Sequence, residues 1–277
     1  MAIVFDDYSS VNQEKIDKKL KSIYDYNIPG MDRKSMLKLI LNCVDLTTLE
    51  GSDNTAKVTE LCKKAVELQP NVAAVCVYPP FVKVCKTLLQ GKNISVASVA
   101  GAFPSGQSPI KVKLQEIQYA IDEGADDIDM VISRGKFLEG NYNEVADEIT
   151  AIKDICKNVH LKVILETGEL QTIANIRKAS ELAINAGGDF IKTSTGKIPV
   201  GATETAALVM VETIKEYYKK TGKLIGFKPA GGIATCDQAI NYLKIVHYNL
   251  GDKWMSNKLF RVGASRLAVL ISGELNK

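Results

Sequence analysis

The chain has 277 residues, of which 46% are hydrophobic, 24% charged and 6% aromatic, a composition typical of a globular protein with a large aliphatic core. The formal net charge is +3, and the 35 basic residues are interleaved with 32 acidic ones, which argues against nucleic acid or an anionic membrane as the main partner. No run approaches the roughly 18 apolar residues that a membrane span needs, and the acidic start of the chain does not fit a signal peptide. We therefore expect a cytoplasmic protein.

The cysteines and histidines exclude several classes of site. Six cysteines are scattered without a Cys-x-x-Cys pair, and the only two histidines are His160 and His247. This distribution argues against a zinc site, a disulfide framework and mechanisms that need a histidine base.

The first predicted element is an amphipathic helix within residues 10–27. Apolar side chains from Ile16 to Tyr24 recur there at helical spacing, and Ser10 with Gln13 has the form of a capping box. We expect this helix to pack on the main body of the protein.

From residue 39 onward, short apolar runs alternate with longer amphipathic segments. The short runs predict eight strands, at residues 39–45, 72–78, 94–100, 127–132, 161–165, 190–194, 224–228 and 259–263. Their spacing of roughly 23 to 35 residues is the length of one strand–helix unit. Runs that are apolar on both faces indicate a parallel sheet covered by helices. The fold class predicted is therefore α/β, as a (β/α)8 TIM barrel rather than an open doubly wound sheet.

The amphipathic segments between the runs predict helices, for example at residues 172–185 and 203–219, and glycines follow both. No linker rich in Gly, Ser or Pro divides the chain. We expect one catalytic barrel domain over residues 36–277, preceded by an N-terminal helical extension over residues 1–35.

Three lysines, Lys162, Lys192 and Lys228, lie inside runs that otherwise predict buried strands. Lysine is rarely buried without a partner or a task. One such task is covalent amine catalysis, in which a desolvated lysine near a second cation loses its proton and attacks a carbonyl. Side chains alternate along a strand, so the inward face of a barrel can hold Lys192 near an acid such as Asp129. Alternatively, each lysine is a surface residue and Asp129 a structural ion-pair partner.

A neighbouring ammonium group suffices to make a neutral amine. Lowering a lysine pKa from about 10.4 to about 7 requires roughly 4.6 kcal/mol. Two ammonium groups about 4 Å apart at an effective dielectric of 20 repel by about 4 kcal/mol, and desolvation has the same sign.

Glycines after the seventh and eighth runs predict a phosphate site. Gly231 and Gly232 precede a helix whose start at residues 235–238 looks like a capping box, and Gly263 and Ser265 follow the eighth run in the same way. Backbone N–H groups at paired glycines and helix N-termini attract anions, and these loops hold phosphate in many barrels. The alternative is that the glycines serve only as tight turns.

Six segments resemble the deoxyribose-phosphate aldolase family, which are class I aldolases on a (β/α)8 barrel. The segments are residues 45–49 (DLTTL), 74–79 (AVCVYP), 161–170 (LKVILETGEL), 189–197 (DFIKTSTGK), 226–232 (GFKPAGG) and 262–265 (VGAS). The resemblance implies reversible cleavage of 2-deoxy-D-ribose 5-phosphate to D-glyceraldehyde 3-phosphate and acetaldehyde. It also implies that no metal or other cofactor is needed, because the iminium itself is the electron sink.

The resemblance further implies that Lys192 forms the Schiff base, that Lys228 lowers its pKa, and that Asp129 with Lys162 and a water shuttles the proton. Contacts to substrate are then expected from Asp45, Thr47, Cys76, Thr195, Gly196, Lys197, Gly231, Gly232, Gly263 and Ser265. Two departures stand out. Arg266 replaces a second serine that many members have, and the sequence ends without the C-terminal tyrosine that bacterial members use in proton transfer.

Two other functions fit the same pattern. One is another phosphate-binding barrel, such as an isomerase or a different Schiff-base aldolase, and the other is a binding protein that keeps the fold without turnover. The expected partner is a small phosphorylated sugar, with neither nucleic acid nor membrane, and self-association into a homo-oligomer is compatible with the sequence.

Overall fold

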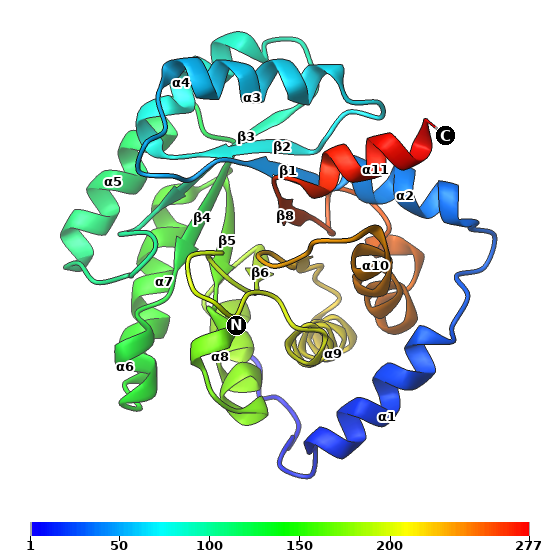
Figure 1. The fold of residues 1–277 in the computed structure, drawn as a ribbon. Helices are drawn as coiled ribbons and strands as arrows, with labels where there is room; N and C mark the ends of the chain where they lie inside the picture. The colour runs from blue at the N-terminus through cyan, green and yellow to red at the C-terminus, as the bar shows by residue number, and fades with distance from the viewer. Residues whose placement is uncertain (1, 277) are drawn as a thin grey trace.

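The computed structural model describes residues 2–276 and has eight parallel strands at its centre (Figure 1). The strands are β1 (Val44–Thr47), β2 (Ala74–Val77), β3 (Ser95–Ala100), β4 (Asp127–Val131), β5 (His160–Ile164), β6 (Phe190–Lys192), β7 (Gly226–Lys228) and β8 (Val262–Ala264). They are hydrogen-bonded in the order β7-β6-β5-β4-β3-β2-β1-β8. Parallel bridges from Phe227 to Phe260 and from Ala230 to Gly263 join the two ends of this sheet. The predicted (β/α)8 barrel is confirmed.

Helices surround the barrel (Figure 1). They are α1 (Gln13–Tyr24), α2 (Arg33–Asn42), α3 (Thr55–Glu67), α4 (Val82–Leu88), α5 (Ile110–Asp122), α6 (Arg134–Leu138), α7 (Tyr142–Cys156), α8 (Ile173–Asn185), α9 (Glu204–Thr221), α10 (Cys236–Leu250) and α11 (Leu267–Leu275). Buried aliphatic side chains fill the layer between these helices and the strands. Within residues 2–276, no helix is long and apolar enough to cross a membrane.

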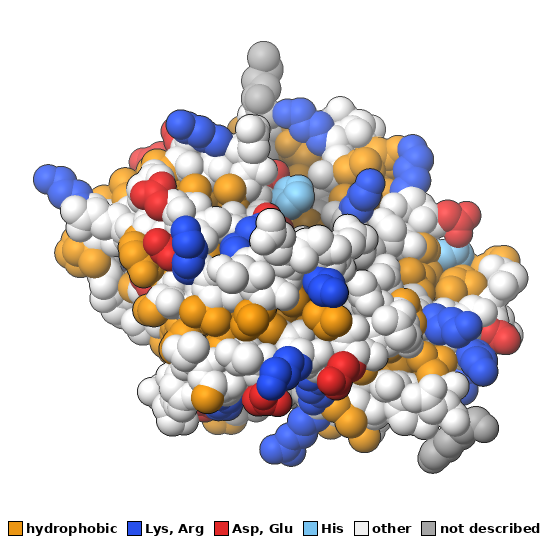
Figure 2. Space-filling view, turned by 90° about the horizontal axis from the view of Figure 1, so that it is seen from above, with side chains coloured by type: hydrophobic (Ala, Val, Ile, Leu, Met, Phe, Trp, Pro, Cys, Tyr) orange, Lys and Arg blue, Asp and Glu red, His pale blue; other side chains and the backbone are white. Residues whose placement is uncertain are grey.

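The charged side chains on the surface are mixed. Figure 2 shows one face of the molecule, on which Lys and Arg side chains lie among acidic and hydrophobic ones rather than in one basic patch. This distribution agrees with the interleaved charges of the sequence.

The predicted first strand is wrong at its start. Residues 39–42 form the last turn of α2, and β1 begins only at Val44. The side chain of Asp32 accepts a hydrogen bond from the backbone N–H of Ser35 at 2.8 Å and so caps α2. Ile40 and Leu41 lie on the buried face of α2, and Leu39 is partly buried. A short apolar run of this kind can belong to a strand or to a helix. The eighth strand is also shifted, to residues 262–264.

The predicted N-terminal helix is confirmed as α1, but its predicted cap is not. Asn12, rather than Ser10, caps α1, and its Oδ1 accepts a hydrogen bond from Lys15 N at 3.0 Å. The buried side chains of α1 face α9 and α10, beside which it lies in Figure 1. The helix therefore adds a layer outside part of the barrel.

Threonine caps fix the starts of the helices near the carboxyl ends of the last strands. Thr203 caps α9 and Thr235 caps α10, where Gln238 completes the predicted capping box. Gly222 ends α9 with φ 70°, a left-handed conformation that favours glycine. These caps hold the loops that precede α9 and α10.

Phe190 fills part of the barrel interior because β7 carries a glycine opposite it. A Cβ atom on Gly226 would lie only 2.2 Å from the Phe190 ring. The ring centre lies 6.0 Å from the Nζ of Lys162 and 6.0 Å from the guanidinium of Arg261. Phe190 thus packs against two of the buried cations of the barrel.

Candidate active site

A cavity of about 760 Å³ opens at the carboxyl ends of the strands, where loops after β1, β6, β7 and β8 meet. The predicted site residues that line it are Thr47, Lys192, Thr195, Gly196, Lys197, Gly231, Gly232, Gly263 and Ser265. This is the rim at which barrel enzymes place their catalytic groups.

Below this cavity, three lysines converge on one carboxylate. The Nζ of Lys192 lies 2.8 Å from Asp129 Oδ2, and the Nζ of Lys228 lies 2.7 Å from the same oxygen. The other oxygen of Asp129 lies 3.0 Å from the Nζ of Lys162. All four side chains are buried, so the alternative that the lysines are surface residues is wrong. Lys192 is the member of this group that also lines the cavity.

The register of the strands brings these groups together. Asp129 on β4 is the Cα partner of Lys162 on β5, and Lys192 on β6 is the partner of Lys228 on β7. Partnered residues in parallel strands point to the same face of the sheet. In this barrel that face is the interior.

Lys192 and Lys228 have shifted pKa values of opposite sign. Burial is the largest cause that lowers the pKa of Lys192, and the Lys228 ammonium lowers it further, against the attraction of Asp129. Burial would also lower the pKa of Lys228, but Asp129 and Asp45 outweigh burial and raise that pKa. Lys228 therefore stays an ammonium while Lys192 is the amine that loses its proton more readily.

From the sequence we expect the neighbouring ammonium to suffice for this shift, with desolvation acting in the same direction. In the structure burial lowers the pKa of Lys192 more than the Lys228 ammonium does. Asp129 contacts both ammonium groups and favours their charged forms. Asp129 itself is held as a carboxylate: burial would raise its pKa, but the three lysines outweigh burial and hold that pKa well below its usual range.

Asp45 and Cys76 are fully buried and are not part of the cavity lining. Asp45 contacts Lys228 through a short ion pair, and its Oδ2 lies 3.8 Å from the Nζ of Lys162. Cys76 on β2 is the Cα partner of Thr47 on β1, and burial raises the pKa of its thiol to about 11. Cys76 is therefore a thiol at neutral pH and not a nucleophile.

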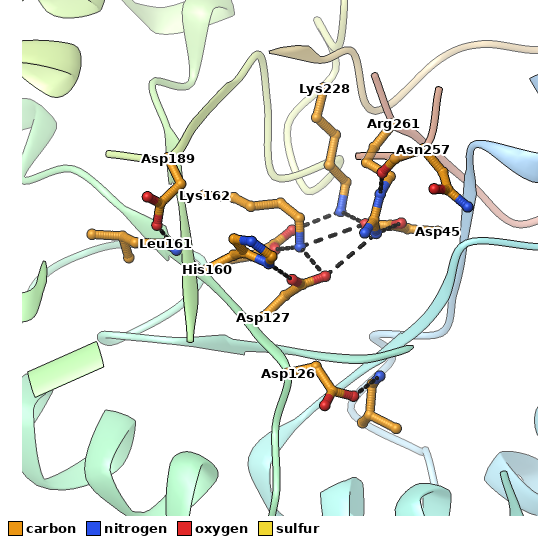
Figure 3. Close-up of polar contacts among 12 residues, drawn as sticks. Asp45, Asp126, Asp127, His160, Leu161, Lys162, Asp189, Lys228, Asn257 and Arg261 are labelled. Atoms are coloured by element: carbon orange, nitrogen blue, oxygen red, sulfur yellow. Dashed lines mark hydrogen bonds and ion pairs between the residues drawn. The ribbon is translucent and has the colours of Figure 1, made fainter. Parts of the chain in front are cut away.

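Two residues that were not predicted extend the cluster, Asp127 and Arg261 (Figure 3). Asp127 Oδ2 lies 2.7 Å from the Nζ of Lys162. Arg261 Nη1 lies 2.8 Å from Asp45 Oδ1 and 3.3 Å from Asp127 Oδ2. Both residues could have been found from the sequence, because each is a charged residue within an apolar run that predicts a strand.

A third missed residue, Glu166, positions one wall of the cavity. It lies two residues after the end of β5, is buried, and has a left-handed φ of 55°. Its Oε1 accepts a hydrogen bond from the backbone N–H of Thr195 at 3.1 Å, and its Oε2 accepts one from the Thr195 hydroxyl at 2.5 Å. Arg134 Nη1 lies 3.3 Å from the same Oε2. Glu166 therefore fixes the loop after β6 that carries Thr195.

The glycines after β7 have a conformation and surroundings that other residues would disturb. Gly231 and Gly232 have φ values of 81° and 77°. A Cβ atom on Gly231 would lie 3.2 Å from the Cα of Gly196 and 3.3 Å from that of Gly201. The close approach of these loops thus depends on Gly231, while Gly232 borders open space.

Three cationic side chains line the outer part of the cavity: Lys57, Lys197 and Arg266. Lys57 is paired with Asp53 at 2.5 Å, and Lys197 is paired with Glu50 at 3.0 Å. Within residues 2–276, Arg266 has no carboxylate partner. Arg266 is therefore the cation in this lining whose charge is not already matched.

Groups of three or more His, Cys, Asp or Glu side chains arranged to hold a metal ion are absent from the part of the chain that the structure describes. The chemistry that the site offers is that of buried amines around a carboxylate, below an open cavity. Fold and site together define a (β/α)8-barrel enzyme with a candidate amine nucleophile.

Comparisons with known proteins identify the family. The model of the DeoC/LacD family of aldolases matches residues 39–250. A deoxyribose-phosphate aldolase of Homo sapiens is 45% identical over 242 residues, which cover 81% of this chain and 76% of that protein. The enzyme of the same name from Bos taurus is 42% identical over 258 residues, which cover 87% and 80%. A solved structure named "QR15, an Aldolase" is 31% identical with a TM-score of 0.70, over 86% of this chain and 96% of that one. The chain belongs to the DeoC/LacD aldolase family.

Proposed function

We propose that this aldolase reversibly cleaves 2-deoxy-D-ribose 5-phosphate to D-glyceraldehyde 3-phosphate and acetaldehyde through a Schiff base on Lys192. The observation that carries the proposal is the position of Lys192, which lines the cavity and also contacts Asp129 in the buried cluster. Curated relatives with the name deoxyribose-phosphate aldolase support the choice of substrate.

In the cleavage direction, the neutral amine of Lys192 attacks the aldehyde carbon C1 of the sugar. Loss of water from the carbinolamine gives an iminium ion on C1. The C2–C3 bond then breaks, its electron pair moves toward the iminium nitrogen, and the C3 hydroxyl gives up its proton as D-glyceraldehyde 3-phosphate forms. The remaining enamine takes a proton at C2, and water releases acetaldehyde.

These steps need a group that accepts and returns protons beside the amine. Asp129 meets this requirement because one of its oxygens is within 2.8 Å of the Lys192 Nζ. Lys162 holds the other oxygen at 3.0 Å, so it orients the carboxylate and can pass a proton through it. Lys228 keeps a positive charge beside Lys192 and disfavours its protonated form.

We assign the phosphate group of the substrate to the part of the cavity lining that the loops after β7 and β8 form. Gly231, Gly232, Gly263 and Ser265 line this part, beside the start of α11. Arg266, which also lines the cavity, adds a cation without a carboxylate partner in the described chain. We assign Arg266 a direct contact with phosphate.

Purified protein incubated with 2-deoxy-D-ribose 5-phosphate tests the function. The expected result is release of acetaldehyde and D-glyceraldehyde 3-phosphate in equal amounts, with activity lost in Lys192→Met and retained in Lys223→Met, an exposed lysine after α9. Cleavage of a different phosphorylated sugar with no acetaldehyde would favour another Schiff-base aldolase. Absence of turnover with every sugar phosphate would favour a binding protein.

Other expectations from the sequence stay proposals. They are that residues 36–277 act as the catalytic domain with residues 1–35 as an appended helical extension, that the enzyme is cytoplasmic, and that it self-associates. Light scattering of the purified chain tests self-association, for which a mass above that of one chain is expected.

A further inference from the structure

The barrel interior holds more buried cations than carboxylates. The cations of the cluster are Lys162, Lys192, Lys228 and Arg261, and the carboxylates are Asp45, Asp127 and Asp129. If all these groups were ionised, the cluster would carry a net charge of +1. A buried net charge is costly, so one of the amines is favoured to lose its proton.

Arg261 forms ion pairs with two of the three carboxylates of the cluster. It lies directly before β8 and is 7% exposed. Its Nη1 bridges Asp45 Oδ1 on β1 and Asp127 Oδ2 on β4, at 2.8 and 3.3 Å, while its Nε donates a hydrogen bond to the carbonyl of Asn257 (Figure 3). A guanidinium suits this position because it stays charged and has several donors in a fixed plane.

The remaining contacts are distributed unequally among the lysines. Lys162 reaches Asp127, Asp129 and, at 3.8 Å, Asp45. Lys228 reaches Asp45 and Asp129. Lys192 reaches only Asp129, through an oxygen that Lys228 also contacts. Lys192 is therefore the cation with the fewest carboxylate contacts in the cluster.

We propose that Arg261 is a positioning residue for the amine chemistry. By pairing with Asp45 and Asp127 it gives the cluster one more cation than it has carboxylates, so that Lys192 enters the reaction as a neutral amine. This inference rests on the proposed Schiff base at Lys192. Arg261 does not line the reaction cavity and acts on Lys192 through the shared carboxylates. Its removal would leave three lysines with three carboxylates, and Lys192 would keep its proton to a higher pH.

Several other groups face this network and enter the test. Cys43 lies near Arg261 at the start of β1, and Cys76 lies near Lys192. His160 on β5 contacts Asp127 Oδ1 through its Nδ1 at 3.1 Å, and its side chain is 59% exposed. His160 and Arg261 also line a second cavity of about 640 Å³, together with residues that precede β3, β4 and β5. Because His160 contacts the same carboxylate as Arg261, its effect must be separated from that of Arg261.

The test is the rate at which acetaldehyde forms an imine on Lys192, trapped with borohydride across a range of pH. A unit charge about 10 Å away at an effective dielectric near 20 shifts a pKa by about one unit. Arg261→Met should therefore move the rising limb of the profile up by about one pH unit, lower the rate at pH 7 about tenfold, and recover rate at higher pH. Arg261→Lys keeps the cation and should retain most of the wild-type profile.

Arg177→Met is the matched control. Arg177 is also a buried arginine and contacts two carboxylates, Glu181 and Glu216, but on α8 and α9 outside the barrel. This variant should leave the pH profile unchanged even if it lowers stability. The Arg261→Met shift should also persist in a His160→Gln background.

Two outcomes would overturn the inference: a folded Arg261→Met protein with an unshifted profile, or an Arg261→Lys profile that moves as far as that of Arg261→Met. If Arg261→Met does not fold, Asp127→Asn tests the same charge balance, because it removes an anion where Arg261→Met removes a cation. Removing that carboxylate should move the profile to lower pH, and no movement or a movement to higher pH would contradict the inference. Failure of the proposed function looks different, because wild-type protein would then trap no adduct on Lys192.

Discussion

Lys192 and Lys228 contact the same oxygen of Asp129, at 2.8 and 2.7 Å, yet their pKa values move in opposite directions. The difference arises from Asp45, which contacts Lys228 and not Lys192. Two carboxylates thus hold Lys228 as a cation. Lys192 shares a single carboxylate, which does not offset the effect of its burial. Such a pair separates the roles of electrostatic neighbour and nucleophile.

The role of Lys228 gives a prediction with a definite sign. Lys228→Leu should raise the pKa of Lys192, because a cation that disfavours the protonated amine is removed. The rate of borohydride trapping with acetaldehyde should fall at pH 7 and recover in part at alkaline pH. Lys228→Arg keeps the charge and should keep the low pKa even if its geometry slows turnover. An unchanged pH profile in folded Lys228→Leu would restrict Lys228 to a ligand contact.

Asp129 is expected to act mainly after the imine has formed. Asp129→Asn removes the carboxylate that raises the pKa of Lys192, so trapping should persist and extend to lower pH. Proton exchange at the methyl carbon of bound acetaldehyde should slow by about 10²- to 10⁴-fold, the usual contribution of a positioned acid or base. Mass spectrometry of acetaldehyde recovered from deuterated water measures this exchange. Loss of trapping in a folded variant would instead assign Asp129 to imine formation.

Arg266 provides the test of the phosphate site. Arg266→Ala should raise KM for 2-deoxy-D-ribose 5-phosphate about 10- to 100-fold, since a hydrogen bond to a charged group contributes about 1.5–3 kcal/mol. The KM for unphosphorylated deoxyribose should stay within about twofold. Lys223→Ala, which removes an exposed cation after α9, serves as the control and should change neither value. Equal effects of Arg266→Ala on both sugars would place the phosphate elsewhere.

The buried carboxylates also predict how stability depends on pH. Burial alone would raise the pKa of Asp127, but Lys162, His160 and Arg261 outweigh burial and hold it below the usual value of about 3.9. At pH values between the depressed pKa and the usual one, the folded protein therefore binds fewer protons than the unfolded chain. The contribution of Asp127 to the free energy of unfolding is complete above about pH 4 and is lost as the pH falls through the depressed pKa.

Asp127→Asn should accordingly cost about 3 kcal/mol at pH 7, because it removes one partner of buried ion pairs. The difference from wild type should narrow as the pH falls below about 4. Urea unfolding of both proteins at pH 7, 4 and 3 measures the stability difference and its dependence on pH. A stability difference that is the same at all three pH values would show that Asp127 contributes through packing and not through its charge.

The sequence predicted the barrel well because eight apolar runs with helical segments between them leave few other folds. The wrong strand assignment at residues 39–42 has a local cause. Ile40 and Leu41 complete the buried face of α2, and a run this short does not reveal whether its period is that of a helix or of a strand. The predicted lysines and Asp129 do meet, since strand alternation points them inward. Arg261 and Glu166 were not predicted, because their partners lie on strands or loops far away in the sequence and are set by barrel register.

The proposed reaction depends on Lys192 as the nucleophile. Treatment of the protein with acetaldehyde and borohydride, followed by peptide mapping, identifies the lysine that forms the imine. Lys197→Met is the matched control, because Lys197 lines the same cavity but is paired with Glu50 outside the buried cluster, and this variant should keep the label. We expect a two-carbon adduct on Lys192 in wild type and none in Lys192→Met. An adduct on Lys162, Lys228 or another lysine, with Lys192 unmodified, would contradict it.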